Sequence, residues 1–274
     1  MPSLTLFTET FGDAAVETAI SSELMARVGA GTMGPSARIH RTEASVAFGR
    51  ADRNAERYPE AVAAARHHGF DAIERLAGGR AAVFHEETIA FSLVLPAEDA
   101  RTGIVERFEW ITSITVGALD AVGVPARVGE VPGEYCPGAY SVNARGRAKL
   151  AGFGQRIVRG AAHVGGVVVV DGAHRIRDVL LPVYAALGIP WDPATVGSVA
   201  DEGGPGVGAV AEALEASLAD RWAITRAPLP EDLVAAGRRS APTYRAAEDG
   251  AGRAGAPAVD RSGTRAHQPD DRRP

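Results

Sequence analysis

The order of strand-like and helix-like segments constrains the fold of this 274-residue chain more than any other feature. Two short segments, 81–84 and 89–95, alternate or run apolar as paired strands do. In the next segment, 103–121, apolar residues recur every three or four positions, which is typical of an amphipathic helix. Strands joined both by short turns and by helices predict an α/β fold of the α+β type, in which helices flank a mixed β-sheet.

The remaining segments fit the same architecture. The expected strands cover 4–8, 45–48, 126–129, 140–142, 149–153 and 167–170, and the expected helices cover 12–28, 59–68, 176–187, 207–222 and 231–236. These elements predict one folded domain over 1–238. Residues 239–274 are rich in Gly, Pro, Asp and Arg and nearly lack large apolar side chains, so they predict a disordered polar tail.

The composition limits the classes of function. The net charge is −5 and there is no dense stretch of Lys and Arg, so the chain lacks the electrostatic footprint of a nucleic-acid-binding protein. No apolar run approaches the roughly 20 residues that cross a bilayer, and the N-terminus lacks a basic segment followed by an apolar one. One cysteine excludes a disulfide framework and leaves too few ligands for a Cys/His metal cluster. We expect a cytoplasmic protein that binds no nucleic acid, membrane or metal.

The single cysteine, Cys136, is followed by Pro137 and Gly138, which predict a rigid turn. Lys149 follows in an apolar segment. A thiolate is the best nucleophile among side chains near neutral pH, and a nearby ammonium stabilises both the thiolate and a developing oxyanion. The pair therefore suggests acyl transfer, although a lone cysteine is also often a small buried apolar residue. None of the histidines stands in a motif that identifies it as the base.

Two further segments have both a functional and a structural interpretation. Gly78 and Gly79 lie between Arg75 and Arg80, a pattern that suits either a ligand bound close to the backbone or a tight turn with solvated arginines. Lys149 shares its predicted strand with glycine, so either a closely fitting ligand pairs with a buried ammonium or the lysine points to solvent from a strand edge.

Together these segments resemble those of the lipoyl and octanoyl branch of the lipoate and biotin protein ligase catalytic domains. The run 75–83 looks like the Arg-x-x-Gly-Gly acyl-pocket motif of that branch, and 149–152 is similar to its lysine motif. The match is closest to the cysteine-dependent octanoyl and lipoyl amidotransferases, in which a Cys-Pro-Gly-x-Tyr loop precedes the lysine strand, as 136–140 does here. The resemblance covers about 46–170 and implies the fold of that catalytic domain.

The resemblance implies a mechanism. Cys136 would accept an octanoyl or lipoyl group as a thioester and pass it to the lysine of a lipoyl domain, while Lys149 holds the carbonyl oxygen. The implied substrate-binding residues are Arg75, Gly78, Gly79, Arg80, His85 and Gly152. No cofactor is required, and the implied partners are lipoyl-domain carriers, namely the H-type protein of glycine cleavage and the E2 subunits of 2-oxoacid dehydrogenases.

Two alternatives remain open from the sequence. An ATP-dependent lipoate-protein ligase on the same fold would use ATP and Mg²⁺ to form lipoyl-adenylate, and Cys136 would then be structural. A non-catalytic module would bind a lipoyl domain in the same pocket, with Cys136 buried and unreactive. A further octanoyltransferase branch carries its cysteine after the lysine, in the segment equivalent to 159–162, where this chain has alanine instead, and is disfavoured.

Overall fold

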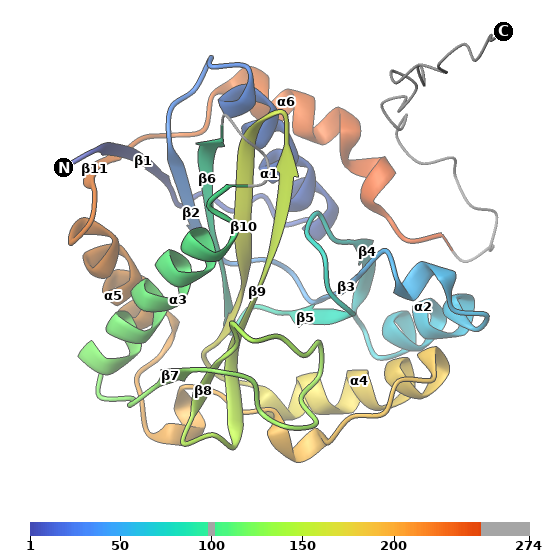
Figure 1. Cartoon of the computed structure of the whole chain (residues 1–274). Coiled ribbons are helices and arrows are strands. Elements are labelled where there is room, and N and C mark those ends of the chain that lie inside the picture. The colour runs from blue at the N-terminus through green and yellow to red at the C-terminus, as the bar shows by residue number, and fades with distance from the viewer. Residues whose placement is uncertain (98–101, 248–274) are drawn as a thin grey trace, which may run out of the picture.

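The computed structural model describes residues 1–97 and 102–247. Its centre is a mixed sheet with the strand order β11-β1-β2-β6-β10-β9-β8-β7 (Figure 1). These strands are β1 (Ser3–Phe7), β2 (Ser36–His40), β6 (Thr88–Ala97), β7 (Arg127–Val128), β8 (Val142–Ala144), β9 (Ala148–Val158), β10 (Gly160–Val169) and β11 (Ala223–Arg226). A smaller sheet has the order β4-β3-β5, formed by β3 (Ser45–Phe48), β4 (Asp71–Glu74) and β5 (Ala82–Phe84).

Six α-helices surround the sheets in the described part of the chain: α1 (Ala14–Gly29), α2 (Tyr58–His67), α3 (Ile104–Ala121), α4 (Ala173–Leu187), α5 (Val207–Ala219) and α6 (Glu231–Ser240). Short 3-10 turns cover Asp52–Asn54, Pro193–Thr195, Ala200–Glu202 and Ala241–Tyr244. Local chemistry helps to fix the starts of two helices. The Asp13 side chain caps α1 by accepting from the backbone N–H of Ala15 and Val16, and α2 has a proline in its first turn.

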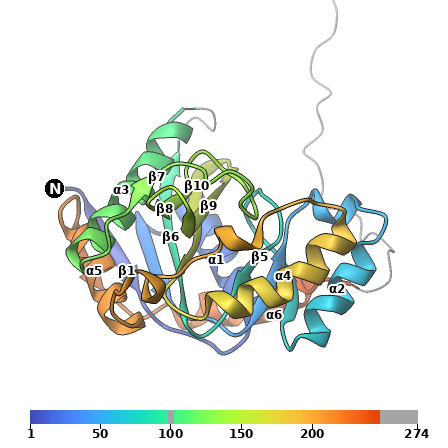
Figure 2. The same ribbon diagram turned by 90° about the horizontal axis from the view of Figure 1, so that it is seen from below.

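The helices form layers on the large sheet. Helices α3 and α5 pack against each other on one face, and α1 and α6 pack together on the opposite face (Figure 1). Helices α2 and α4 lie side by side, next to the small sheet (Figure 2). The alternation along β6 explains this arrangement, because Phe91 and Leu93 belong to the core under α3 and α5 while Val94 packs under α1.

The observed architecture confirms the expected α/β fold with a mixed sheet and flanking helices. The expected pairing of the strands at 81–84 and 89–95 is wrong, because β5 pairs with β3 in the small sheet while β6 pairs with β2 and β10 in the large one. Three strands lack a sequence prediction: β2, β4 and β11. Strand β10 begins at Gly160, well before the predicted start at 167. The prediction missed the first half of the strand because that half is rich in Ala and Gly and lacks a run of large apolar residues. The described fold continues past the expected boundary at 238, and Ala246 packs in the core with Ala72. The rest of the expected tail, 248–274, lies outside the described residues.

None of the helices within 1–97 and 102–247 combines the length and the apolar character that crossing a membrane requires.

Candidate functional site

The cysteine lies in a cavity of about 390 Å³. We call it the cysteine cavity. Its wall includes β9, β10, the start of α3 and the segment 131–141, which we call the cysteine loop. The predicted site residues that line it are Arg75, Gly78, Gly79, Cys136, Lys149 and Gly152.

Two donors face the sulfur of Cys136. The backbone N–H of Arg80 lies 3.2 Å from Sγ, and the Arg75 guanidinium lies 3.5 Å from it. The same Arg75 nitrogen donates to the Arg80 carbonyl at 2.9 Å, which ties the arginine to the turn beside the cysteine. A positive charge and an aligned N–H both stabilise negative charge on sulfur, so this environment suits a nucleophilic thiolate.

The turn of residues 78–80, here called the glycine turn, needs glycine for steric reasons. Gly79 has a φ of +114°, and a Cβ built there would lie 2.9 Å from the Cys136 Sγ. A Cβ at Gly49 would lie 1.8 Å from the carbonyl oxygen of Gly79. The buried Asp52 carboxylate holds this contact, since it accepts from the Gly49 N–H at 2.8 Å and pairs with the Arg80 guanidinium at 3.3 Å.

Lys149 is buried and does not point to solvent from a strand edge. Its ammonium donates to the Glu134 carboxylate at 3.0 Å, to the Tyr135 carbonyl at 3.0 Å and to the Cys136 carbonyl at 2.8 Å. Glu134 also accepts from the N–H groups of Val131 and Gly138 and from the Ser141 hydroxyl. This buried ion pair therefore holds both ends of the cysteine loop.

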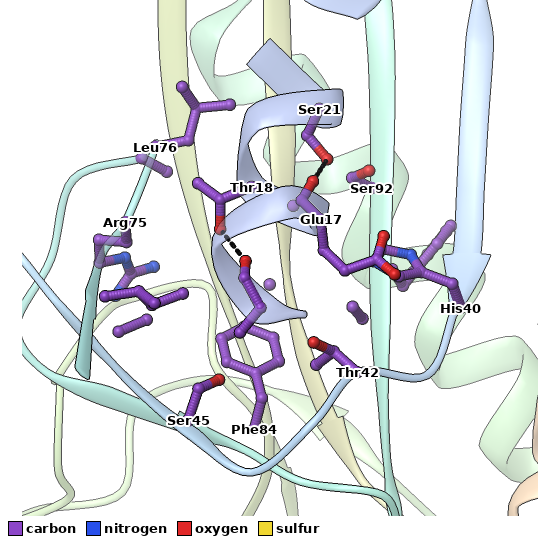
Figure 3. A pocket seen from close by; sticks show the side chains of 18 of the residues that line it. Glu17, Thr18, Ser21, His40, Thr42, Ser45, Arg75, Leu76, Phe84 and Ser92 are labelled. Atoms are coloured by element: carbon purple, nitrogen blue, oxygen red, sulfur yellow. Dashed lines mark hydrogen bonds and ion pairs between the residues drawn. The ribbon is translucent and has the colours of Figure 1, made fainter. Parts of the chain in front are cut away.

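A second cavity of about 100 Å³, here called the inner cavity, adjoins the cysteine cavity. Both are lined by Arg75, Phe84 and Gly166. In Figure 3, Arg75 forms one wall, His40 and Ser92 lie on the other, and α1 contributes Glu17, Thr18 and Ser21 between them. The two cavities are therefore neighbours that share part of their walls.

The inner cavity is apolar along part of its wall and polar along the rest. Strand register brings Ser92 opposite both Arg38 and Gly165, so these residues form one row across the sheet. Within this row, the Arg38 guanidinium forms a buried ion pair with the Glu17 carboxylate at 2.6 Å. Five buried polar atoms that line the cavity have no hydrogen-bond partner within the described residues: His40 Nδ1, Thr42 Oγ1, Ser45 Oγ, Ser92 Oγ and His163 Nδ1.

The buried histidines predict a loss of stability in acid. Burial and the nearby Arg38 charge lower the pKa of His163 to about 4, and burial lowers the pKa of His85 to about 4 as well. The unfolded chain therefore binds protons below about pH 6.5 that the folded chain does not bind. We expect urea titrations to give an unfolding free energy that falls by about 1.4 kcal/mol per pH unit for each such histidine between pH 6 and 4.5.

Two variants separate this effect from general acid unfolding. The variant His163→Asn removes one of the titrating groups, so its unfolding free energy should depend less steeply on pH than that of the wild type. The control His67→Ala removes an exposed histidine at the end of α2 and should leave the slope unchanged. Equal slopes for the wild type and His163→Asn would contradict the assignment.

Two expected site residues, Arg80 and His85, do not present their side chains to the cysteine cavity. Arg80 reaches the cysteine through its backbone, while its side chain pairs with Asp52. His85 is fully buried and is not among the residues that line either cavity. Its Nδ1 accepts from the Glu87 N–H. Within the described residues, no group of three or more His, Cys, Asp or Glu side chains is arranged to hold a metal ion.

The residues that sequence reasoning missed include Glu134, Asp52 and Tyr184. Glu134 lies two residues before Cys136, and this proximity was the only sequence feature that could have identified it as a site residue. Asp52 and Tyr184 come from distant segments, and only the folded chain brings them to the cysteine and the glycine turn.

Comparisons with known proteins agree with this geometry. Two curated relatives are octanoyl-[GcvH]:protein N-octanoyltransferases. The one from Geobacillus kaustophilus is 31% identical over 176 residues, which is 64% of this chain and 62% of the relative. The one from Anoxybacillus flavithermus is 31% identical over 163 residues, which is 59% of this chain and 58% of the relative. The chain thus matches about three fifths of the length of these relatives.

Solved structures share the fold. A lipoate-protein ligase A bound with ATP superposes with a TM-score of 0.71 at 18% identity, covering 88% of this chain and 95% of that one. A bi-partite lipoate protein ligase from Thermoplasma acidophilum has a TM-score of 0.67 at 19% identity, covering 88% and 92%. The family model of the lipoyl protein ligase A/B catalytic domain matches residues 13–218. The chain belongs to the lipoyl protein ligase A/B catalytic domain family.

Proposed function

We propose that this chain is an acyltransferase that moves an octanoyl or lipoyl group through a thioester on Cys136 to the lysine of a lipoyl domain. The observation that carries the proposal is the environment of the sulfur, which borders a cavity of about 390 Å³ and faces the Arg75 guanidinium and the Arg80 N–H. The octanoyltransferase names of the curated relatives support the same reaction.

The first half of the reaction loads the enzyme. The Cys136 thiolate attacks the carbonyl carbon of an octanoyl amide on a carrier lysine, and a C–S bond forms as the C–N bond breaks. The carrier amine leaves with a proton from solvent. The Arg75 guanidinium is close enough to the sulfur to stabilise the developing oxyanion.

Lys149 takes on a different role in this mechanism from the one suggested by sequence. Its three N–H groups already donate to acceptors of the cysteine loop. The Lys149 ammonium could hold the substrate carbonyl only if it gave up one of these three hydrogen bonds. In the structure as it stands, the ammonium stabilises the cysteine loop.

The second half of the reaction transfers the acyl group. The neutral amine of the acceptor lysine attacks the thioester carbon, the C–N bond forms, the C–S bond breaks and the thiolate returns. The amine releases its proton to water. Donor and product are both amides of similar energy, so the cycle needs neither ATP nor Mg²⁺. A cytoplasmic, reducing compartment suits this chemistry, because Cys136 must remain a free thiol.

The acyl chain would extend from the sulfur past Phe84 and Gly166 into the inner cavity, which both residues border. Gly78, Gly79 and Gly152 leave room at the entrance because they carry no side chains. Burying about seven methylenes at ~0.8 kcal/mol each gives up to roughly 5 to 6 kcal/mol, which is enough to select a chain by its fit.

The donor and acceptor proteins follow from the same proposal. The H-type protein of glycine cleavage is the proposed octanoyl donor, because the curated relatives are named for GcvH. The E2 subunits of 2-oxoacid dehydrogenases, which also carry lipoyl domains, are the proposed acceptors.

Intact mass spectrometry tests the proposal. We expect the purified chain, incubated with an octanoylated H-type protein without ATP, to gain the mass of one octanoyl group. An unmodified lipoyl domain should then discharge the adduct. Lipoylation of the acceptor only when ATP, Mg²⁺ and free lipoate are supplied would identify a ligase instead. Carrier binding without either modification would identify a non-catalytic binding module.

A further inference from the structure

A buried tyrosine connects the two segments that surround the sulfur. Tyr184 lies on α4 and is fully buried. Its ring packs beside Trp191, with ring centroids 5.4 Å apart. The hydroxyl accepts from the Cys136 N–H at 2.9 Å and donates to the Ala81 carbonyl at 2.9 Å. One oxygen atom therefore contacts both the cysteine loop and the residue that follows the glycine turn.

The protonation state of Tyr184 supports this double role. Burial raises the pKa of Tyr184 well above that of a free tyrosine, so the hydroxyl keeps its proton. A neutral phenol has one proton to donate and lone pairs to accept with. The Ala81 carbonyl uses the proton and the Cys136 N–H uses a lone pair, so both bonds form at the same time.

The backbone conformation of Cys136 depends on contacts such as the one with Tyr184. Cys136 has a φ of +43°, in the left-handed region that residues other than glycine seldom adopt. Such a conformation persists only where surrounding contacts hold it. The Lys149 ammonium holds the Cys136 carbonyl and Tyr184 holds its N–H, so both backbone polar groups are fixed while the side chain faces the cavity.

We propose that Tyr184 is a positioning residue that keeps the Cys136 sulfur within reach of the Arg80 N–H by joining the cysteine loop to Ala81. Ala81 directly follows Arg80, so a hydroxyl bound to both Ala81 and Cys136 sets the separation of the sulfur and that N–H, which is 3.2 Å. The inference rests on the proposed function only in assigning Cys136 as the acyl-accepting group.

The variant Tyr184→Phe tests this role, because it removes the hydroxyl and keeps the ring. Cys136 is the only cysteine in the chain, so alkylation by iodoacetamide reports on this thiol alone. We expect Tyr184→Phe to lower the alkylation rate of the folded protein and to lower single-turnover acylation between about tenfold and 10²-fold. The apparent KM for the octanoylated carrier should stay within about twofold, because the hydroxyl does not bind the carrier.

Tyr58→Phe is the matched control. Tyr58 belongs to the same core cluster as Tyr184, and its buried hydroxyl has no hydrogen-bond partner within the described residues. This variant should alkylate and acylate at the wild-type rates. Both variants and the wild type should alkylate equally in urea, where the fold no longer acts on the thiol.

The alkylation rate distinguishes a residue that positions the Cys136 sulfur from one that only limits the mobility of the cysteine loop. A cysteine loop that merely becomes mobile exposes its thiol, so faster or unchanged alkylation in Tyr184→Phe would overturn the inference. A wild-type protein that forms no octanoyl adduct would overturn the proposed function. Slower alkylation in Tyr184→Phe would still support the positioning role in that case, because iodoacetamide needs no acyl donor.

Discussion

Replacing Cys136 with alanine is expected to abolish the octanoyl adduct and to lower transfer to a lipoyl domain on the order of 10⁴-fold or more. The thiolate is the atom that bonds to the acyl carbon, and alanine offers no substitute. The measurement is intact mass after incubation with the octanoylated carrier, together with transfer kinetics. The exchange is small and the Cys136 side chain is only partly buried, so melting temperatures should show that the variant folds.

Cys136→Ser gives the matched comparison. Serine keeps the size and position of the nucleophile but offers a hydroxyl that is almost entirely protonated near neutral pH. We expect it to bind the octanoylated carrier as the wild type does and to form the acyl adduct far more slowly. Transfer by Cys136→Ala at the wild-type rate would show that the acyl group never resides on this residue.

Replacing Glu134 with alanine is expected to lower the unfolding free energy by about 3–5 kcal/mol, because it leaves a buried ammonium without its counter-ion. The same variant deprives the N–H groups of Val131 and Gly138 of their acceptor. Equilibrium unfolding in urea measures the loss. The cysteine loop should also lose its fixed geometry, so acyl transfer by the remaining folded protein should fall.

Three comparisons separate charge, hydrogen bonding and surface effects. Glu134→Gln keeps an acceptor oxygen and should fall between alanine and the wild type. The double variant Glu134→Leu/Lys149→Met removes both charges and should recover part of the stability without recovering transfer. Glu60→Ala removes an exposed carboxylate that pairs with Arg57 and should leave stability unchanged. A stable Glu134→Ala protein with wild-type activity would contradict the role of the ion pair.

Much of the fold is predictable from local pattern. The strand 45–48 and the helix over 103–121 have strong apolar periodicity, and both lie within a residue of the expected bounds. Strand β2 is harder to predict because it carries Arg38 and His40, whose burial depends on Glu17 from another element. The strand alternates, with Ala37 and Ile39 in the core, but such a pattern predicts a half-buried strand, and only its partners in the fold explain why its polar residues are buried as well.

The candidate site was predictable in some of its residues and not in its contacts. Cys136, Lys149 and the glycine turn stand out because their chemistry is unusual in their local sequence. Sequence spacing does not show that the Lys149 ammonium would face the carbonyl of Cys136 and not solvent. Nor does it show that Tyr184, nearly fifty residues from the cysteine, would bind its backbone, because that contact depends on where α4 packs.

The close approach of Gly49 to the glycine turn has a consequence for how sequence variation at this site is read. Any side chain at position 49 would occupy the space of the Gly79 carbonyl, and the turn could then no longer keep its place beside the sulfur. The position contributes no reactive group, no charge and no bound ligand. Its contribution is empty space for the neighbouring backbone. A description of this candidate site by its reactive side chains alone is therefore incomplete, because it omits the positions at which a side chain must be absent.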